Sequence, residues 1–120
     1  MSTDINFFGN GIRNGKQYLS QLQDGRDVWL RGTKVKDVTS HPGLGPGAHT
    51  LGRFLDKQFD PALQGKLTYV EDGMRYGMSF KTPKNREDVS ARGAAFYEWA
   101  KWSNGMFGRT PDYKNASVMA

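Results

Sequence analysis

Large apolar side chains are scarce in this chain, and that scarcity limits the folds open to it. Leucine, isoleucine, valine and phenylalanine together supply 23 of its 120 residues, whereas glycine supplies 15. A domain of this length buries only about 60–70% of its unfolded surface even in a favourable case. Fifteen aromatic residues and a net charge of only +5 argue against disorder. We therefore expect one small domain that folds but is marginal on its own.

Composition also excludes several classes of protein. The chain has no cysteine, which rules out disulfides, thiolate-bound zinc, iron–sulfur clusters and a cysteine nucleophile. Its longest apolar runs fall far short of the ~20 residues that span a bilayer, and its N-terminus lacks the pattern of a signal peptide. We expect a cytoplasmic protein with no membrane partner. The isoelectric point of about 9.6 permits an anionic partner, but basic and acidic residues are interspersed.

Apolar periodicity and turn signals predict a mainly α fold with small β-hairpins, which is an α+β class. Residues 1–13 are polar and glycine-rich, and we expect them to form a flexible N-terminal extension. The predicted elements are a helix over 14–23, a hairpin over 28–35, a helix over 48–58, a hairpin over 67–80 in which Tyr76, Met78 and Phe80 share one face, a helix over 85–104, and a last helix from Thr110 into Ala120.

The predicted helix over 85–104 is the longest and carries two apolar stripes. One stripe holds Val89, Gly93, Phe96 and Ala100, and the other holds Ala95, Trp99, Trp102 and Met106. Two stripes indicate that the helix packs against more than one neighbour. We therefore expect the isolated chain to expose an apolar surface around Trp99, Trp102 and Met106, and to be prone to associate. Gly105 is the predicted C′ residue, just past the helix end.

The glycine-rich segment Gly43–Ala48 is the first candidate site. Its sequence, Gly-Leu-Gly-Pro-Gly-Ala, matches a permissive dinucleotide-binding pattern, and Glu71 ends a later predicted strand, as an acidic ribose partner would. The preceding residues 37–42 are polar and end in proline, however, whereas a nucleotide-binding loop follows a buried strand. Pro46 also lacks an N–H for a phosphate. We favour a plain loop before a helix.

His41 and His49, the only histidines in the chain, are the second candidate site. No carboxylate lies at a clear metal-ligand spacing from both, and no His-Glu-x-x-His pattern occurs. We therefore interpret them as ordinary loop and helix residues and expect no metal.

Aromatic and basic residues interleave on the two predicted hairpins, which would suit a single-stranded nucleic acid. The aromatic residues are Trp29, Tyr69, Tyr76 and Phe80, and the basic ones are Arg31, Lys34, Lys66 and Arg75. Aromatic residues on short strands usually lie in the core, above all where aliphatic residues are scarce. We expect no nucleic-acid partner, and a small basic nucleic-acid-binding module is the less favoured alternative.

Arg109 and Tyr113 form the fourth candidate site. Thr110 has the properties of an N-cap residue, and Pro111 and Asp112 suit the first turn of the helix after it. Arg109 offers a rigid fork of cationic donors, Tyr113 offers a phenolic hydroxyl, and the helix N-terminus adds partial positive charge. This combination would favour an oxyanion such as a carboxylate or a phenolate. The structural alternative, in which Arg109 pairs with an acid and Tyr113 lies in a core, stays open.

Three segments, in order, carry a family resemblance. They are Gly15-x2-Tyr18-Leu19-x2-Leu22-x-Asp24-Gly25-Arg26-x-Val28, then Val35-x-Asp37-Val38-Thr39-x-His41-Pro42, then Gly108-Arg109-Thr110-Pro111-Asp112-Tyr113-x-Asn115-Ala116. Over about residues 12–120, the chain resembles the start of the 4-hydroxyphenylacetate 3-hydroxylase family. Its members are the oxygenase components of two-component phenol monooxygenases that use reduced flavin, and halophenol and nitrophenol hydroxylases are close relatives.

The resemblance implies an architecture. Family members are similar to acyl-CoA dehydrogenases, with an N-terminal helical domain, a middle β-domain and a C-terminal helical bundle that forms a homotetramer. Residues 14–120 are then expected to be the N-terminal domain alone, without the middle domain and the bundle. A thin core suits such a domain, because its second face would be covered by parts of the subunit outside this chain.

The resemblance also implies a reaction. In the family, a separate flavin reductase supplies FADH2, which reacts with O2 to give a C4a-hydroperoxyflavin that transfers oxygen to a phenolic substrate. The residues matching Arg109 and Tyr113 contact the phenol hydroxyl, joined by a histidine from the middle domain, and most flavin contacts lie in the other domains. The chemistry of these side chains agrees, because an arginine beside a phenol favours the more nucleophilic phenolate, and a tyrosine would orient it.

Two expectations narrow this assignment. The related 4-hydroxybutyryl-CoA dehydratases hold an iron–sulfur cluster through cysteines, so the cysteine-free sequence argues against that activity. The main alternative to a working hydroxylase domain is a truncated, inactive fragment of such an enzyme, because the middle domain and the bundle are not included in residues 14–120.

Overall fold

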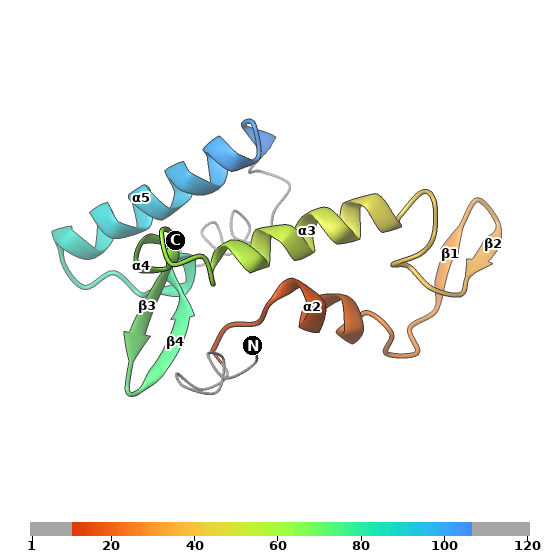
Figure 1. The fold of residues 1–120 in the computed structure, drawn as a ribbon, viewed down its shortest axis with the longest axis horizontal. Coiled ribbons are helices and arrows are strands. Elements are labelled where there is room, and N and C mark those ends of the chain that lie inside the picture. Colours follow the sequence, from red (N-terminus) through yellow and green to blue (C-terminus); the bar gives the residue numbers. More distant parts are fainter. Residues whose placement is uncertain (1–10, 107–120) are drawn as a thin grey trace. The chain divides into compact units, whose positions relative to one another are not determined.

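The structure, a computed structural model, describes residues 11–106. These residues divide into two compact units, one over 13–56 and the other over 57–106 together with 11–12. Helices and two small antiparallel sheets alternate along the chain, which confirms the expected mixture of helices and β-hairpins (Figure 1). Within 11–106, no helix is long and apolar enough to cross a membrane.

The first unit begins with helix α2, Gly15–Gln21, which ends two residues before the predicted limit. Asn14 caps it, because its side chain accepts the Gln17 N–H at 2.8 Å while the Gln17 side chain accepts the Asn14 N–H at 2.9 Å. This reciprocal pair satisfies two N–H groups that the helix start would otherwise leave unbonded.

Helix α3, Gly45–Lys57, packs closely against α2 because both helices have glycine at the contact. A Cβ built on Gly15 would lie 2.5 Å from the carbonyl oxygen of Gly52, so no larger residue fits there without a shift. The Gly15 N–H donates to Oδ1 of Asp56 at 2.7 Å. A carboxylate from α3 therefore completes the N-terminus of α2.

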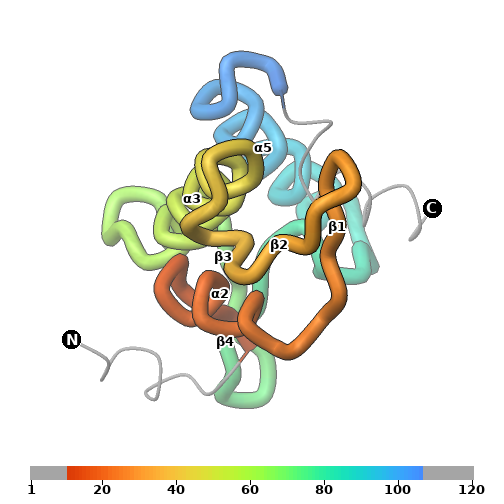
Figure 2. The backbone as a smooth tube through the Cα atoms, turned by 90° about the vertical axis from the view of Figure 1, so that its right-hand side faces the viewer, coloured from red at the N-terminus to blue at the C-terminus, as the bar shows by residue number. Residues whose placement is uncertain are grey.

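Two short strands form a hairpin in this unit: β1, Val28–Leu30, and β2, Thr33–Val35. Arg31 and Gly32 join them with φ values of 51° and 77°, as a type I′ turn requires, and Figure 2 shows the chain reversing there. Val35 is buried, whereas Trp29 pairs across the hairpin with Lys34 and is 60% exposed. The hairpin thus has one buried face and one face that carries an exposed tryptophan.

The second unit contains α4, Gln64–Leu67, β3, Thr68–Glu71, β4, Met74–Gly77, the 3₁₀ helix η1, Met78–Phe80, and α5, Arg86–Trp102. Strands β3 and β4 pair about Asp72 and Gly73, whose φ values are 52° and 77°. The Asp-Gly pair therefore forms the tight hairpin turn that the sequence predicts.

The second strand of this hairpin is shorter than predicted. It ends at Gly77, where a Cβ would lie 3.2 Å from the Phe80 ring and 3.3 Å from Oε1 of Gln58. The 3₁₀ turn that follows buries Met78 but leaves Phe80 50% exposed. The expectation that Tyr76, Met78 and Phe80 share one face is therefore wrong, because a helical turn replaces the strand alternation.

The structure also corrects which face of α5 is exposed. Trp99 is only 4% exposed and is buried together with Ala95, so the expected apolar surface around Trp99 is wrong. Trp102 is half-buried, with Nζ of Lys57 at 4.9 Å from its ring centroid. The exposed large apolar residues on and after this helix are Val89, Tyr97 and Met106. Because both stripes are apolar, periodicity alone did not distinguish the core face from the outer face.

The core is thin, as the composition predicts. Its buried apolar residues within the described range are Ile12, Val35, Ala48, Phe54, Leu67, Met78, Ala95 and Trp99. Leucine, phenylalanine and tryptophan each occur only once among these eight residues. The packing of each large side chain therefore matters for the stability of the fold.

Candidate functional site

The favoured site residues, Arg109 and Tyr113, lie outside the described residues, as does the predicted helix from Thr110. The described chain ends at Met106, three residues before Arg109. It therefore includes the helix that leads to this segment, and the other candidate sites predicted earlier in the chain.

Helix α5, which leads to this segment, is held near both ends. Near its start, the Asp88 carboxylate lies 2.9 Å from Nζ of Lys81 and accepts the Lys84 N–H at 3.0 Å, and these hydrogen bonds lower the pKa of Asp88. Near its end, Nζ of Lys101 lies 2.7 Å from Glu98, which lowers the pKa of Glu98 and raises that of Lys101. The helix is thus tied to the preceding loop and braced along its last turn.

The end of α5 is a Schellman motif. Ser103 is the C-cap residue, the Asn104 N–H donates to the Lys101 carbonyl at 3.3 Å, and the Gly105 N–H donates to the Ala100 carbonyl at 2.9 Å. Asn104 is therefore C′ and Gly105 is C″, which corrects the expectation that Gly105 is C′. The signal was present in the sequence, because asparagine also tolerates the left-handed conformation and precedes the glycine.

The glycine-rich segment Gly43–Ala48 lacks the setting of a nucleotide-binding loop. Turns precede it rather than a strand, and α3 starts inside it at Gly45, three residues earlier than predicted. The Gly45 N–H donates to the His41 carbonyl at 2.7 Å, so it is already used within the chain. Pro46 fits the first helical turn, where a missing N–H costs little. These contacts support the interpretation of a structural helix start.

The two histidines bond to backbone groups of neighbouring residues. Nδ1 of His41 accepts the Gly43 N–H at 2.9 Å, and Nε2 of His49 lies 3.0 Å from the Thr39 carbonyl and donates to it. In the part of the chain that the structure describes, no cluster of three or more potential ligands could hold a metal ion. Both histidines therefore have structural roles in the turn before α3.

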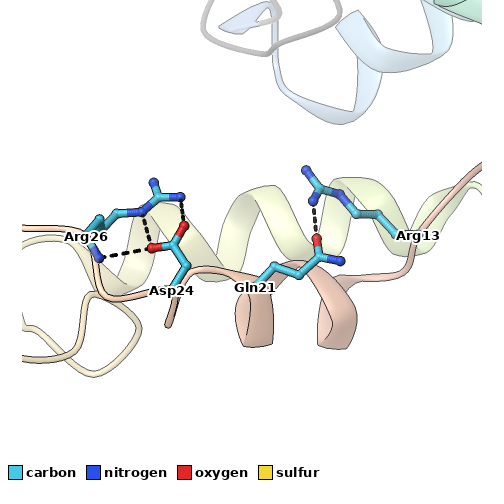
Figure 3. A network of polar contacts seen from close by, with 4 residues as sticks. All are labelled: Arg13, Gln21, Asp24 and Arg26. Carbon is cyan, nitrogen blue, oxygen red and sulfur yellow. Dashed lines mark hydrogen bonds and ion pairs between the residues drawn. The ribbon is translucent and has the colours of Figure 1, made fainter.

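The first two family-like segments contain turns that aspartates stabilise. Asp24 accepts three hydrogen bonds from Arg26, from Nη2 at 2.6 Å, Nε at 2.8 Å and the backbone N–H at 3.2 Å (Figure 3). These bonds, the side-chain ones above all, lower the pKa of Asp24 to about 2. Asp37 accepts the Thr39 hydroxyl at 2.7 Å and its N–H at 3.0 Å, which lowers the pKa of Asp37. These family-like residues therefore shape the backbone.

The structure divides the interleaved aromatic and basic residues between the two units. Trp29, Arg31 and Lys34 belong to the first unit and the others to the second. Three of the cations contact neighbouring groups: Lys34 with Asp27 at 3.2 Å, Lys66 with Glu98 at 3.9 Å, and Arg75 with Thr68 at 2.6 Å. Two of these four cations thus pair with a nearby acid, and a third donates to a hydroxyl.

Comparison with known proteins gives the family. A family model described as 4-hydroxyphenylacetate 3-hydroxylase N terminal matches residues 14–120. The 4-hydroxyphenylacetate 3-monooxygenase oxygenase component of Thermus thermophilus is 44% identical over 109 residues, covering 90% of this chain and 23% of that protein. The 4-nitrophenol 2-monooxygenase oxygenase component of a Rhodococcus species is 36% identical over 110 residues, covering 88% and 21%. The chain thus spans less than a quarter of the length of these curated relatives.

Solved structures share the fold. The crystal structure of the oxygenase component of 4-hydroxyphenylacetate 3-monooxygenase matches with a TM-score of 0.84 and 44% identity, covering 89% of this chain and 23% of that one. Crystal structures of that component with FAD, and with FAD and 4-hydroxyphenylacetate, match equally well. The family expected from the three segments is therefore confirmed. The chain belongs to the 4-hydroxyphenylacetate 3-hydroxylase family, whose N-terminal region it matches.

Proposed function

We propose that this chain is the N-terminal domain of the oxygenase component of a flavin-dependent phenol monooxygenase, and that Arg109 and Tyr113 bind the phenol oxygen. The observation that carries the proposal is the family match over residues 14–120, which includes the segment of both residues. A relative crystallised with FAD and 4-hydroxyphenylacetate supports a phenolic substrate and a flavin. The proposed partners are O2 and a separate reductase that supplies FADH2.

The proposed role of the chain is to bind the phenol and favour its anion. A free phenol with a pKa near 10 is mostly protonated at neutral pH. A guanidinium within hydrogen-bond distance stabilises the phenolate, which lowers the pKa of the bound phenol, and Tyr113 donates a hydrogen bond that orients it. Reduced flavin and O2 supply the oxygen atom, and the phenolate carbon ortho or para to the oxygen is the nucleophile that receives it.

Flavin binding is not assigned to any residue within 11–106. The glycine-rich segment was the candidate cradle for a phosphate, but the Gly45 N–H is bonded to His41 and Pro46 has no N–H. The proposed contribution of the chain is therefore to the phenol site, with most flavin contacts supplied by other parts of the subunit.

The proposed domain is residues 14–120, preceded by the extension 1–13, in a cytoplasmic, tetrameric subunit similar to acyl-CoA dehydrogenases. A middle β-domain and a C-terminal helical bundle would complete it. The outer face of α5 supports this proposal, because Val89 and Tyr97 are 59% and 64% exposed and Gly93 between them has nothing within 4 Å of a Cβ. An exposed apolar face of this kind is typical of a surface that another domain covers.

A chimera tests the role of Arg109. In it, this chain replaces the matching N-terminal segment of the Thermus thermophilus oxygenase component, and chemically reduced FAD is supplied with O2. We expect Arg109→Ala to lower kcat/KM for 4-hydroxyphenylacetate by about 10²–10³-fold, the usual effect of removing an oxyanion donor. Oxidation of the reduced flavin by O2 should continue, with hydrogen peroxide released in place of hydroxylated product.

Arg86→Ala is the matched control, because Arg86 is an exposed arginine at the start of α5. It should leave hydroxylation unchanged. Equal turnover in the Arg109→Ala and Arg86→Ala chimeras would contradict the proposed phenol site.

The second candidate function is a domain that has no hydroxylase activity by itself. The 120-residue chain, mixed with reduced FAD, O2 and 4-hydroxyphenylacetate, should give no hydroxylated product. Product formation by the chain alone would exclude this candidate.

A further inference from the structure

Asparagine followed by glycine is a pair that can rearrange spontaneously, because glycine has no side chain to shield its backbone nitrogen. Within residues 11–106 the pair occurs twice, as Asn14-Gly15 and as Asn104-Gly105. Both pairs offer the same reacting groups, so their surroundings in the fold determine which of them reacts.

The reaction forms one bond and breaks another. The glycine nitrogen attacks Cγ of the asparagine amide, a new N–C bond forms, the Cγ–Nδ2 bond breaks, and Nδ2 leaves as ammonia with the proton of the glycine N–H. Water then opens the resulting five-membered imide at either carbonyl, which gives aspartate or isoaspartate. The glycine nitrogen must therefore be free to leave its own hydrogen bond.

The fold holds both reacting groups of Asn14-Gly15. Oδ1 of Asn14 accepts the Gln17 N–H at 2.8 Å, which fixes the amide as the helix cap. The Gly15 N–H donates to the Asp56 carboxylate at 2.7 Å, a charge-assisted bond. Gly15 is also buried, and a Cβ on it would lie 2.5 Å from the Gly52 carbonyl oxygen. Release of its nitrogen therefore requires α2 to move away from α3.

The fold holds Asn104-Gly105 less firmly. Both residues are exposed, and among the described residues no hydrogen-bond partner holds the Asn104 side chain. The Gly105 N–H donates to the Ala100 carbonyl at 2.9 Å, a bond between neutral groups at the end of α5. Helix ends fray at little cost in free energy, so this nitrogen is released by opening of the last turn alone.

We infer that Asn104 is a modification site, which converts spontaneously to aspartate and isoaspartate, and that the contact between α2 and α3 protects Asn14 from the same reaction. Either product places a negative charge at the C-terminal end of α5, where the helix dipole already disfavours one. Isoaspartate also adds a carbon to the backbone, which shifts the Gly105 N–H away from the Ala100 carbonyl. The modification therefore loosens the last turn of α5.

The test follows both pairs in the natural 120-residue chain. The chain is kept in mildly alkaline buffer, cut after arginine at successive times, and analysed by mass spectrometry. The pairs then lie in separate peptides, 14–26 and 93–109, which contain no other asparagine. We expect Asn104 to convert at least about 10-fold faster than Asn14, with both isoaspartate and aspartate formed. In concentrated urea, where the fold is lost, the two rates should be similar.

Asp56→Ala tests the protection of Asn14 directly. It removes the acceptor of the Gly15 N–H, so the Asn14 rate should rise toward its value in urea, while the Asn104 rate stays unchanged. Asp27→Ala is the matched control, because Asp27 is an exposed acid in the same unit that pairs only with Lys34 among the described residues. It should change neither rate.

Four outcomes would overturn the inference. In the folded chain, conversion of Asn14 as fast as that of Asn104, or no conversion of Asn104, would remove the difference between the two sites. Aspartate without isoaspartate would exclude the cyclic route. A slower reaction of Asn14 in Asp56→Ala would show that Asp56 takes the proton from the Gly15 N–H and promotes the attack instead of preventing it.

Discussion

The Asp88 carboxylate makes two contacts in the second unit that protonation would weaken. Its side chain is only 13% exposed, and it bonds to Nζ of Lys81 and the N–H of Lys84, so it links the loop before α5 to the first turn of that helix. Its own N–H donates to Asn85 at 2.8 Å. The negative charge of this carboxylate strengthens both contacts. It also interacts favourably with the partial positive charge at the N-terminus of α5.

We predict that the Asp88 carboxylate makes the stability of the fold depend on pH in the acidic range. The pKa of Asp88 is lowered in the folded chain, mainly by Lys81, so its contribution is fully present above the unfolded pKa of about 3.8 and is lost as the pH falls through the lower, folded value. Asp88→Asn should therefore lower the melting temperature near pH 6, and the difference from the natural chain should shrink below about pH 4. Thermal melts monitored by circular dichroism measure both.

Glu87→Gln is the control, because Glu87 is an exposed acid in the same helical turn. It shares the effect of the helix N-terminus but should cost less stability than Asp88→Asn. A melting temperature of Asp88→Asn equal to that of Glu87→Gln at pH 6 would argue against a special role for the Lys81 contact.

At the scale of elements, the contact between α2 and α3 depends on one glycine. Gly15→Ala should destabilise the first unit by about 1–3 kcal/mol, because its Cβ would press on the Gly52 carbonyl and on Asp56. Gly47→Ala should instead be neutral or stabilising by up to about 1 kcal/mol, since that glycine lies in α3 with open space around it. Urea unfolding of the two variants measures the difference. Equal stability would show that the helices can move apart freely.

Local sequence patterns predicted a hairpin correctly where specific turn residues determine the structure. Asp72-Gly73 indicated a hairpin turn, and both residues have the positive φ that this turn needs. The strand was wrong beyond Gly77, because alternating apolar residues over Met78–Phe80 fit a strand and a 3₁₀ turn equally well. In the structure, a Cβ on Gly77 would lie 3.3 Å from Oε1 of Gln58, a residue 19 positions away in the chain. A contact of that range is not visible in a local pattern.

For the whole molecule, the exposed face of α5 predicts association. We expect the chain to self-associate at high concentration, and Val89→Asp to weaken that association at least about 5-fold, because a buried valine contributes more than 1 kcal/mol to an apolar contact. Sedimentation velocity measures the association, and a thermal melt checks that the fold is intact. Val70→Asp is the control, since Val70 is 47% exposed on β3 and not on this face. Similar effects of both substitutions would show that the α5 face has no special role.

The candidate site, Arg109 and Tyr113, stays a prediction from the sequence, because both residues lie outside the described range. Arg109 and Tyr113 stand out because the arginine is followed directly by a predicted N-cap residue and a proline, and the tyrosine lies in the same short segment. The turn that leads to them was harder to predict, because Asn104 and Gly105 were equally good choices for C′. The hydrogen bond from Gly105 to Ala100 settles which residue has which role. Similarly, both stripes of α5 were apolar, and only burial identifies Trp99 as the core residue.

The unequal surroundings of the tryptophans give this molecule built-in optical reporters. Trp29 is the sole tryptophan of the first unit and is 60% exposed, while Trp99, in the second unit, is 4% exposed. Trp102, the third, lies beneath the ammonium group of Lys57. Red-shifted, readily quenched fluorescence therefore belongs to the β1–β2 hairpin, and blue-shifted, protected fluorescence belongs to α5. The shift of the protected emission to longer wavelength can thus follow the melting of the second unit, without any added label.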